Sequence, residues 1–84
     1  MSDQPVVLDT LGEFCPVPVI RLNKLVSSVP PGTLIEVLSD DEGAKVDIPV
    51  WCRMKHHEFL GQHDRARGWA FLVRTTLGDS GAKE

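Results

Sequence analysis

The sequence predicts a two-layer α/β sandwich in which two helices pack on one face of a mixed four-stranded sheet. Strand-like and helix-like segments follow one another in the order βαβαββ. Strand–helix–strand units require right-handed crossovers and make the sheet partly parallel, whereas the last two strands are close enough to form an antiparallel hairpin. The chain has 84 residues, 42% of them hydrophobic and 25% charged. This is the composition of one small globular domain rather than of a disordered segment.

The first half of the chain contains a strand, a helix and a second strand. The first strand is a β-branched run at residues 6–9, and the second covers residues 33–39. Between them, residues 16–29 are predicted to be helical, and the Pro-Pro-Gly sequence at 30–32 ends the helix. The apolar residues of this helix recur at helical spacing: Val19, Leu22, Leu25, Val26 and Val29.

The second half is predicted to hold one helix and two strands. The helix is expected to start with Asp47 as its cap, with Pro49 in the first turn, and to run to Leu60 before Gly61. Residues 62–67 are an expected edge strand, Gly68 a turn, and residues 69–75 the final strand. We therefore expect one domain over residues 1–84, with a core at about 6–75 and a flexible tail at 78–84.

The composition argues against several classes of function. Nine Lys and Arg against twelve Asp and Glu give a net charge of −3, without the basic stripe that nucleic-acid binding needs. The apolar runs are far shorter than the roughly 20 residues that cross a bilayer, and the first residues lack a signal segment. We therefore expect a cytoplasmic protein with no direct nucleic-acid or membrane partner. Two cysteines are too few for a disulfide scaffold.

Cys15 is the strongest candidate for chemistry. A residue before proline is driven into extended backbone, so Cys15 is expected at the N-cap, with Pro16 at N1 and Pro18 at N3. The helix dipole and free amides there would favour a thiolate, which is the nucleophilic form. The alternative is that the Cys-Pro-x-Pro sequence only starts a helix and that Cys15 is a small buried hydrophobe.

Cys52 is expected to be structural, because a helical wheel places it on one face with Ile48, His56 and Phe59. A thiol buried among apolar residues has a raised pKa and is inert. The three histidines at 56, 57 and 63 lack the paired ligand spacing of zinc sites, and nucleotide-binding glycine motifs are absent. The sequence thus predicts neither a metal nor an organic cofactor.

Two surface features should accompany Cys15. The acidic loop at 40–42 follows the second strand as Cys15 follows the first, so both are expected at the carboxyl edge of the parallel strands. If close, its charge would oppose thiolate formation. The helical period also predicts a solvent-facing docking patch beside the thiol, formed by Val17, Ile20, Arg21 and Lys24.

Several of these features occur together in a known family. The chain contains the pattern Asp9-x-x-Gly12-x-x-Cys15-Pro16-x-Pro18. A Pro-Gly turn, an Asp-Asp loop and the sequence Asp47-Ile48-Pro49-x-Trp51-Cys52 follow it. In these motifs the chain resembles the TusA/SirA family of sulfur-carrier proteins, over about residues 6–75.

The resemblance implies that Cys15 carries a persulfide sulfur and that Pro16 and Pro18 set its helix start. A cysteine desulfurase or rhodanese-like protein would supply the sulfur, and an acceptor protein would take it onward, with no cofactor beyond the covalently held sulfur. Family members serve tRNA thiolation, molybdenum-cofactor supply or sulfur oxidation. Two other functions stay open from the residues: a non-catalytic interaction or regulatory module, and a redox switch using Cys15 and Cys52.

Overall fold

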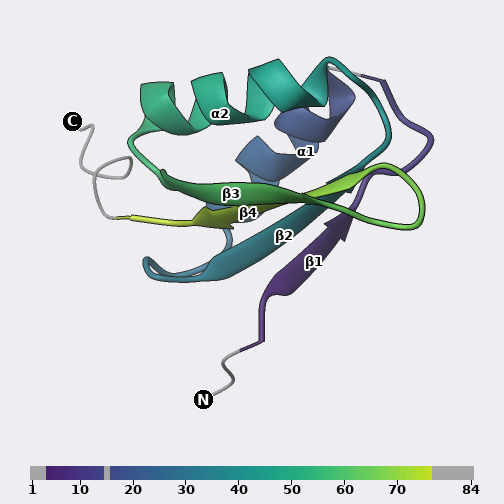
Figure 1. The fold of residues 1–84 in the computed structure, drawn as a ribbon. Coiled ribbons are helices and arrows are strands. Elements are labelled where there is room, and N and C mark those ends of the chain that lie inside the picture. The colour runs from purple at the N-terminus through teal and green to yellow at the C-terminus, as the bar shows by residue number, and fades with distance from the viewer. Residues whose placement is uncertain (1–3, 15, 77–84) are drawn as a thin grey trace.

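The computed structural model describes residues 4–14 and 16–76. The elements follow the predicted βαβαββ order: β1 (Val6–Asp9), α1 (Val17–Val26), β2 (Leu34–Ser39), α2 (Ala44–Lys55), β3 (Glu58–Asp64) and β4 (Trp69–Arg74). Both helices lie on the same face of the sheet (Figure 1). The predicted two-layer sandwich is thus confirmed, while the expected tail at 78–84 lies outside the described residues.

The strand order is β1-β2-β4-β3, so the last strand of the chain lies inside the sheet. β1 pairs with β2 in parallel, and β4 is antiparallel to both β2 and β3. β1, β2 and β3 therefore all run in the same direction, and their carboxyl ends share one end of the molecule with the turn between β3 and β4 (Figure 1). β3 is an edge strand, as predicted, but it starts at Glu58 instead of residue 62.

The core lies between the sheet and the helices. Ile35 pairs with Val73, and Val37 pairs with Phe71, so alternate residues of β2 and β4 point toward the helical layer. α1 contributes two of its predicted apolar residues, Leu22 and Val26. α2 adds four side chains from its inner face: Ala44, Ile48, Trp51 and Cys52. Each large apolar side chain buried in this way stabilises the fold by about 1.5–3 kcal/mol.

The start of α1 differs from the prediction by one residue. Pro16 is the N-cap, not N1, and Pro18 is the second helical residue, not the third. Cys15, the predicted N-cap, lies outside the described residues. The Val17 amide donates to the Phe14 carbonyl at 2.9 Å, and neither proline has an N–H, so the first turn offers fewer free amides than predicted.

α1 also ends three residues earlier than predicted, at Val26. The Ser27 hydroxyl donates to the Lys24 carbonyl at 2.7 Å, and the Ser28 hydroxyl donates to the Leu25 carbonyl at 2.8 Å. These side chains take carbonyls that a continuing helix would use, which is why serine favours helix ends over helix interiors.

The prediction for the start of α2 was wrong. The helix begins at Ala44, so Asp47 lies in its first turn rather than capping it, and Pro49 lies inside it. The amides of residues 44–46 donate to the carbonyls of residues 41–43, and this turn leads directly into the helix. Pro49 has no N–H, so the helix lacks one hydrogen bond there. The core packing of its neighbours offsets this loss: Ile48, Trp51 and Cys52.

The predicted end of α2 was also wrong. The helix ends at Lys55, because His56 adopts a left-handed conformation with φ of 64°. His56 is consequently exposed instead of sharing the inner face with Cys52. Phe59 belongs to β3, opposite Val73, and still packs against the core from the sheet. Strand pairing with β4 thus overrides the helical pattern after residue 55.

Gly68 lets the β3–β4 turn press against the end of β2. A Cβ at this position would lie 2.3 Å from the Ser39 carbonyl oxygen and 2.8 Å from the Asp40 Cα. The residue also has a φ of 71°, a conformation in which non-glycine residues are strained. Only glycine therefore allows the close approach of these two backbone segments.

We predict that Gly68→Ala destabilises the fold by about 1–3 kcal/mol more than Gly32→Ala does. Both glycines have positive φ, 71° and 88°, so both substitutions introduce similar backbone strain. A Cβ at Gly32 would have no neighbour within 4 Å, so the difference isolates the clash at Gly68. Urea unfolding of the two variants measures it, and equal losses would contradict the close packing.

Candidate functional site

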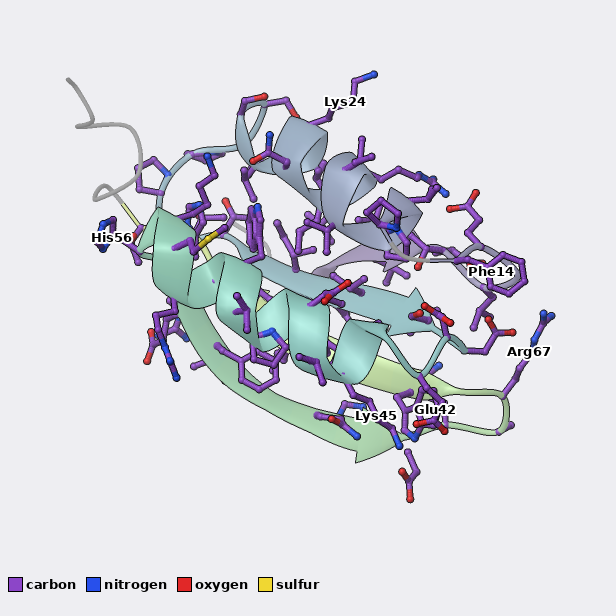
Figure 2. The ribbon with its side chains drawn as sticks, turned by 90° about the horizontal axis from the view of Figure 1, so that it is seen from above. Phe14, Lys24, Glu42, Lys45, His56 and Arg67 are labelled. Carbon is purple, nitrogen blue, oxygen red and sulfur yellow. The ribbon has the colours of Figure 1, made fainter. Side chains whose placement is uncertain are left out.

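The candidate site is the end of the molecule where the loop of residues 10–14 leads from β1 toward Cys15 and α1. Cys15 lies outside the described residues, so the structure does not test its predicted role, but it describes the residues on both sides. Phe14 is 74% exposed, and Pro16 is exposed as well. Figure 2 shows Phe14 and Arg67 at the same end of the molecule and His56 at the opposite end.

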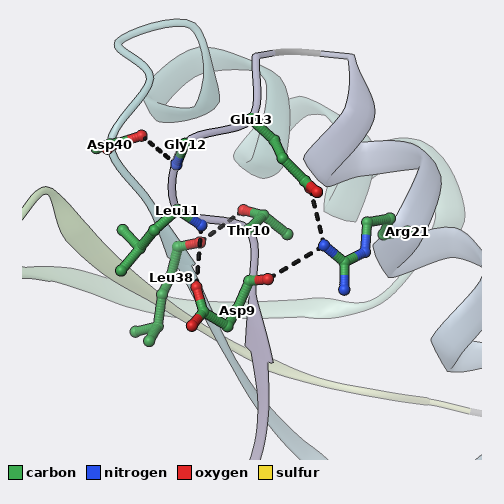
Figure 3. A network of polar contacts seen from close by, with 8 residues as sticks. All are labelled: Asp9, Thr10, Leu11, Gly12, Glu13, Arg21, Leu38 and Asp40. Carbon is green, nitrogen blue, oxygen red and sulfur yellow. Dashed lines mark hydrogen bonds and ion pairs between the residues drawn. The ribbon is translucent and has the colours of Figure 1, made fainter.

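The loop starts with an extension of the β1–β2 pairing. Thr10 is fully buried, and its amide and hydroxyl both donate to the Leu38 carbonyl, at 2.9 and 2.6 Å. The Leu11 amide donates to the Asp9 carboxylate at 3.0 Å (Figure 3). The Glu13 amide donates to the Thr10 carbonyl at 3.1 Å. These contacts close a tight turn directly after the strand.

Asp40 fixes the next part of the loop. Its Oδ1 accepts a hydrogen bond from the Gly12 amide at 3.0 Å, and its Oδ2 accepts one from Arg67 Nε at 2.7 Å. The Gly12 hydrogen bond and the Arg67 guanidinium lower the pKa of Asp40 below its ordinary value, so this carboxyl is ionised at neutral pH. The predicted closeness of the acidic loop and the loop before Cys15 is thus confirmed through Asp40.

Arg21 holds the same loop from the side of α1. Its Nη1 donates to the Asp9 carbonyl at 3.1 Å and to Glu13 Oε1 at 2.8 Å (Figure 3). The sequence predicted a solvent-facing cation for partner docking, and the side chain is 41% exposed, but the loop engages its charge. Helical periodicity gives the direction of Arg21 but cannot show that the preceding loop folds back along the helix.

The other residues of the predicted docking patch do face solvent. Val17 is 39% exposed and Ile20 is 53% exposed. Lys24 projects away from the body of the molecule (Figure 2). The helical wheel therefore placed these three side chains correctly, while their role in partner binding stays a prediction.

A groove of about 190 Å³ between α1 and α2 begins beside the start of α1. Its lining is mostly apolar: Pro16, Val19, Asp47, Val50, Trp51 and Met54. Trp51 is fixed in the lining, because its indole Nε1 donates to Asn23 Oδ1 at 3.3 Å and its ring stacks on His57 at 5.1 Å.

Sequence reasoning missed this groove because it started α2 too late. The signal was an exposed apolar series at a spacing of four: Val46, Val50 and Met54.

Cys52 is buried, as predicted, with 1% of its surface exposed. Burial raises the pKa of the Cys52 thiol to about 12, so it remains protonated at neutral pH. The histidines do not gather around it as a metal site: residues 4–14 and 16–76 contain no group of three His, Cys, Asp or Glu able to hold an ion. His57 instead accepts a hydrogen bond at Nδ1 from the Thr76 amide.

Comparison with known proteins assigns the chain to a family. Residues 6–75 match the model of the family described as sulfurtransferase TusA, and the chain belongs to this family. A sulfur carrier protein TusA from Pseudomonas fluorescens is 34% identical over 75 residues, which cover 87% of this chain and 90% of that protein. Another, from Pseudomonas entomophila, is 36% identical over 67 residues, covering 80% and 84%.

A solved structure shares the fold. The crystal structure of a SirA-like protein from Desulfitobacterium hafniense aligns with a TM-score of 0.71 at 21% identity, over 83% of this chain and 95% of that one. Within the described residues, no helix is long and apolar enough to cross a membrane. Family membership therefore supports a sulfur-carrier role for this two-layer domain.

The burial of Cys52 generates a test of the two thiols. In the native protein an alkylating reagent should modify Cys52 far more slowly than Cys15, because the Cys52 thiol is both inaccessible and protonated. Peptide mass mapping after short exposures measures both rates, and denaturant should remove the contrast. Equal native rates would contradict the assignment of Cys52 to the core.

Proposed function

We propose that this protein is a sulfur carrier that holds a persulfide sulfur on Cys15. The observation that carries the proposal is the match to the TusA family over residues 6–75, a range that includes the Cys-Pro-x-Pro sequence. The donor would be a cysteine desulfurase or a rhodanese-like protein, and the acceptor another protein of a sulfur-trafficking pathway. We place the carrier in the cytoplasm. The pathway that it serves would be tRNA thiolation, molybdenum-cofactor supply or sulfur oxidation.

The proposed transfer is an exchange between sulfur atoms. The Cys15 thiolate attacks the terminal sulfur of the donor persulfide, a bond forms between Cys15 Sγ and that sulfur, and the sulfur–sulfur bond of the donor breaks. The donor cysteine leaves as a thiolate, which takes up a proton, and no electrons enter or leave the pair of proteins. The same step, with Cys15 persulfide as the donor, passes the sulfur to the acceptor. Neither step requires a metal or an organic cofactor.

The surroundings of Cys15 suit such an exchange. The preceding loop is fixed by hydrogen bonds to β2, Asp40 and Arg21, so the chain before the cysteine has a defined path. After the cysteine, Pro16 and Pro18 start α1, and their restricted φ angles favour the helical start. Exposed apolar residues and the groove of about 190 Å³ lie beside this helix start and offer contact area to partner proteins.

The other two functions considered from the sequence receive less support. A switch that forms a disulfide between Cys15 and Cys52 requires a Cys52 thiolate or an accessible sulfur, and Cys52 offers neither. An interaction module without sulfur chemistry would use the same groove, so we distinguish it from a carrier by direct loading.

Loading of Cys15 is the central test. After incubation with a cysteine desulfurase and cysteine, the intact mass should increase by one or more sulfur atoms, and a reductant should remove the increase. Cys15→Ser should abolish the adduct. Cys52→Ala is the matched control and should leave it largely intact, because that thiol is buried. Loading that persists in Cys15→Ser would contradict the proposal.

The docking patch requires a separate experiment. Ile20→Ser and Lys24→Glu should slow sulfur transfer from the donor or to the acceptor while changing stability by less than about 0.5–1 kcal/mol, because both side chains face solvent. Val7→Ser is a suitable control, since Val7 is similarly exposed, at 56% against 53% for Ile20, but lies on β1. Transfer rates equal to wild type with both partners, at all salt concentrations, would exclude the patch.

A further inference from the structure

We propose that Asp40 is a positioning residue for sulfur transfer, acting through the loop that leads to Cys15. The inference rests on the proposed function, because it concerns the same cysteine. It extends that function by assigning a role to a residue that lies 25 positions away in the sequence and belongs to another loop.

Asp40 joins three segments that are distant in the chain. It follows β2, its Oδ1 accepts from the Gly12 amide in the loop after β1, and its Oδ2 accepts from Arg67 in the β3–β4 turn. The backbone of Asp40 is itself held, because Gly68 allows the β3–β4 turn to approach it more closely than any side chain would permit. The carboxylate therefore has a fixed position from which to hold Gly12.

Gly12 is a sensitive place to hold this loop. Its φ of 84° lies in the left-handed region that favours glycine, and it lies three residues before Cys15, a span of at most about 10 Å. The two intervening residues also form hydrogen bonds: the Glu13 amide donates to the Thr10 carbonyl, and the Phe14 carbonyl accepts from the Val17 amide. A shift at Gly12 is therefore transmitted toward the cysteine along a short stretch of backbone whose intervening residues are themselves held.

The chemistry of Asp40 explains why a carboxylate is needed. Each of its two oxygens takes one donor, Gly12 on one side and Arg67 on the other. An asparagine has a single side-chain oxygen, so it could keep the Gly12 hydrogen bond only by turning its own N–H donors toward Arg67. Charge-assisted hydrogen bonds are about twice as strong as neutral ones, so the charge itself strengthens the hold on Gly12.

The functional consequence concerns the rate of the exchange step. Attack on the donor persulfide requires the two sulfurs to meet in line at short distance, and small displacements of a reacting group lower the rate strongly. Loss of the Gly12 contact should thus slow transfer within the complex of carrier and donor. It should have less effect on complex formation, which we assign to the exposed residues of α1.

We test this with Asp40→Ala, Asp40→Asn and the control Glu36→Gln. Glu36 lies on β2 and, like Asp40, forms an ion pair with an arginine of the β3–β4 turn. Its Oε2 lies 3.1 Å from Nη1 of Arg65. This ion pair does not include the contact that holds Gly12. In single-turnover loading by a desulfurase, Asp40→Ala should lower the rate at saturating donor by roughly tenfold or more, with the half-saturating donor concentration nearly unchanged. Asp40→Asn should fall between Asp40→Ala and wild type, and Glu36→Gln should match wild type.

A second measurement needs no partner protein. Hydrogen exchange of the Gly12 amide, followed by NMR, should accelerate in Asp40→Ala and Asp40→Asn but not in Glu36→Gln, because that amide donates to Asp40. The asparagine variant, nearly the same size as the native residue, serves if the alanine variant folds poorly.

The outcomes separate the two proposals. Wild-type loading rates in both Asp40 variants would overturn the positioning role, as would a change confined to the half-saturating donor concentration or an unchanged Gly12 exchange rate. If wild-type protein itself cannot be loaded while the Gly12 amide still depends on Asp40, the contact is real and the sulfur-carrier function is what fails.

Discussion

The parallel pairing of β1 with β2 is the constraint on which the rest of the site depends. It brings the carboxyl ends of both strands to one end of the sheet, and the two hydrogen bonds from Thr10 to the Leu38 carbonyl extend it beyond the last residue of β1. The loop before Cys15 consequently runs beside the loop after β2. Without this pairing the Asp40 carboxylate would have no access to Gly12.

Charged side chains then hold the loop before Cys15 from two sides. Asp40 accepts from Gly12 on one side of the loop, and Arg21 donates to Asp9 and Glu13 on the other. Such contacts at a surface add little to the free energy of unfolding, because water competes with them. These contacts instead fix the backbone of the loop before Cys15. That loop must stay at the surface if Cys15 is to react with other proteins.

The fold buries one of the two cysteines in its core. Cys52 is enclosed in the apolar layer between α2 and the sheet, where burial raises its pKa to about 12 and suppresses its reactivity. Cys15 belongs to a segment whose described neighbours, Phe14 and Pro16, are exposed. For the proposed carrier role of Cys15, a second thiol that is protonated and out of contact with solvent disfavours an internal disulfide.

The sequence by itself determined the element order, the two-layer architecture, the inner face of α1 and the burial of Cys52, because hydrophobic periodicity reports directly which side chains leave water. It also indicated that the acidic loop and the loop before Cys15 share one end of the sheet. Only the tertiary structure decided the bounds of α2, where turn hydrogen bonds at residues 41–46 and strand pairing after His56 override local propensity. It likewise decided the partners of Arg21 and Asp40, because contacts between residues far apart in the chain leave no periodic signal.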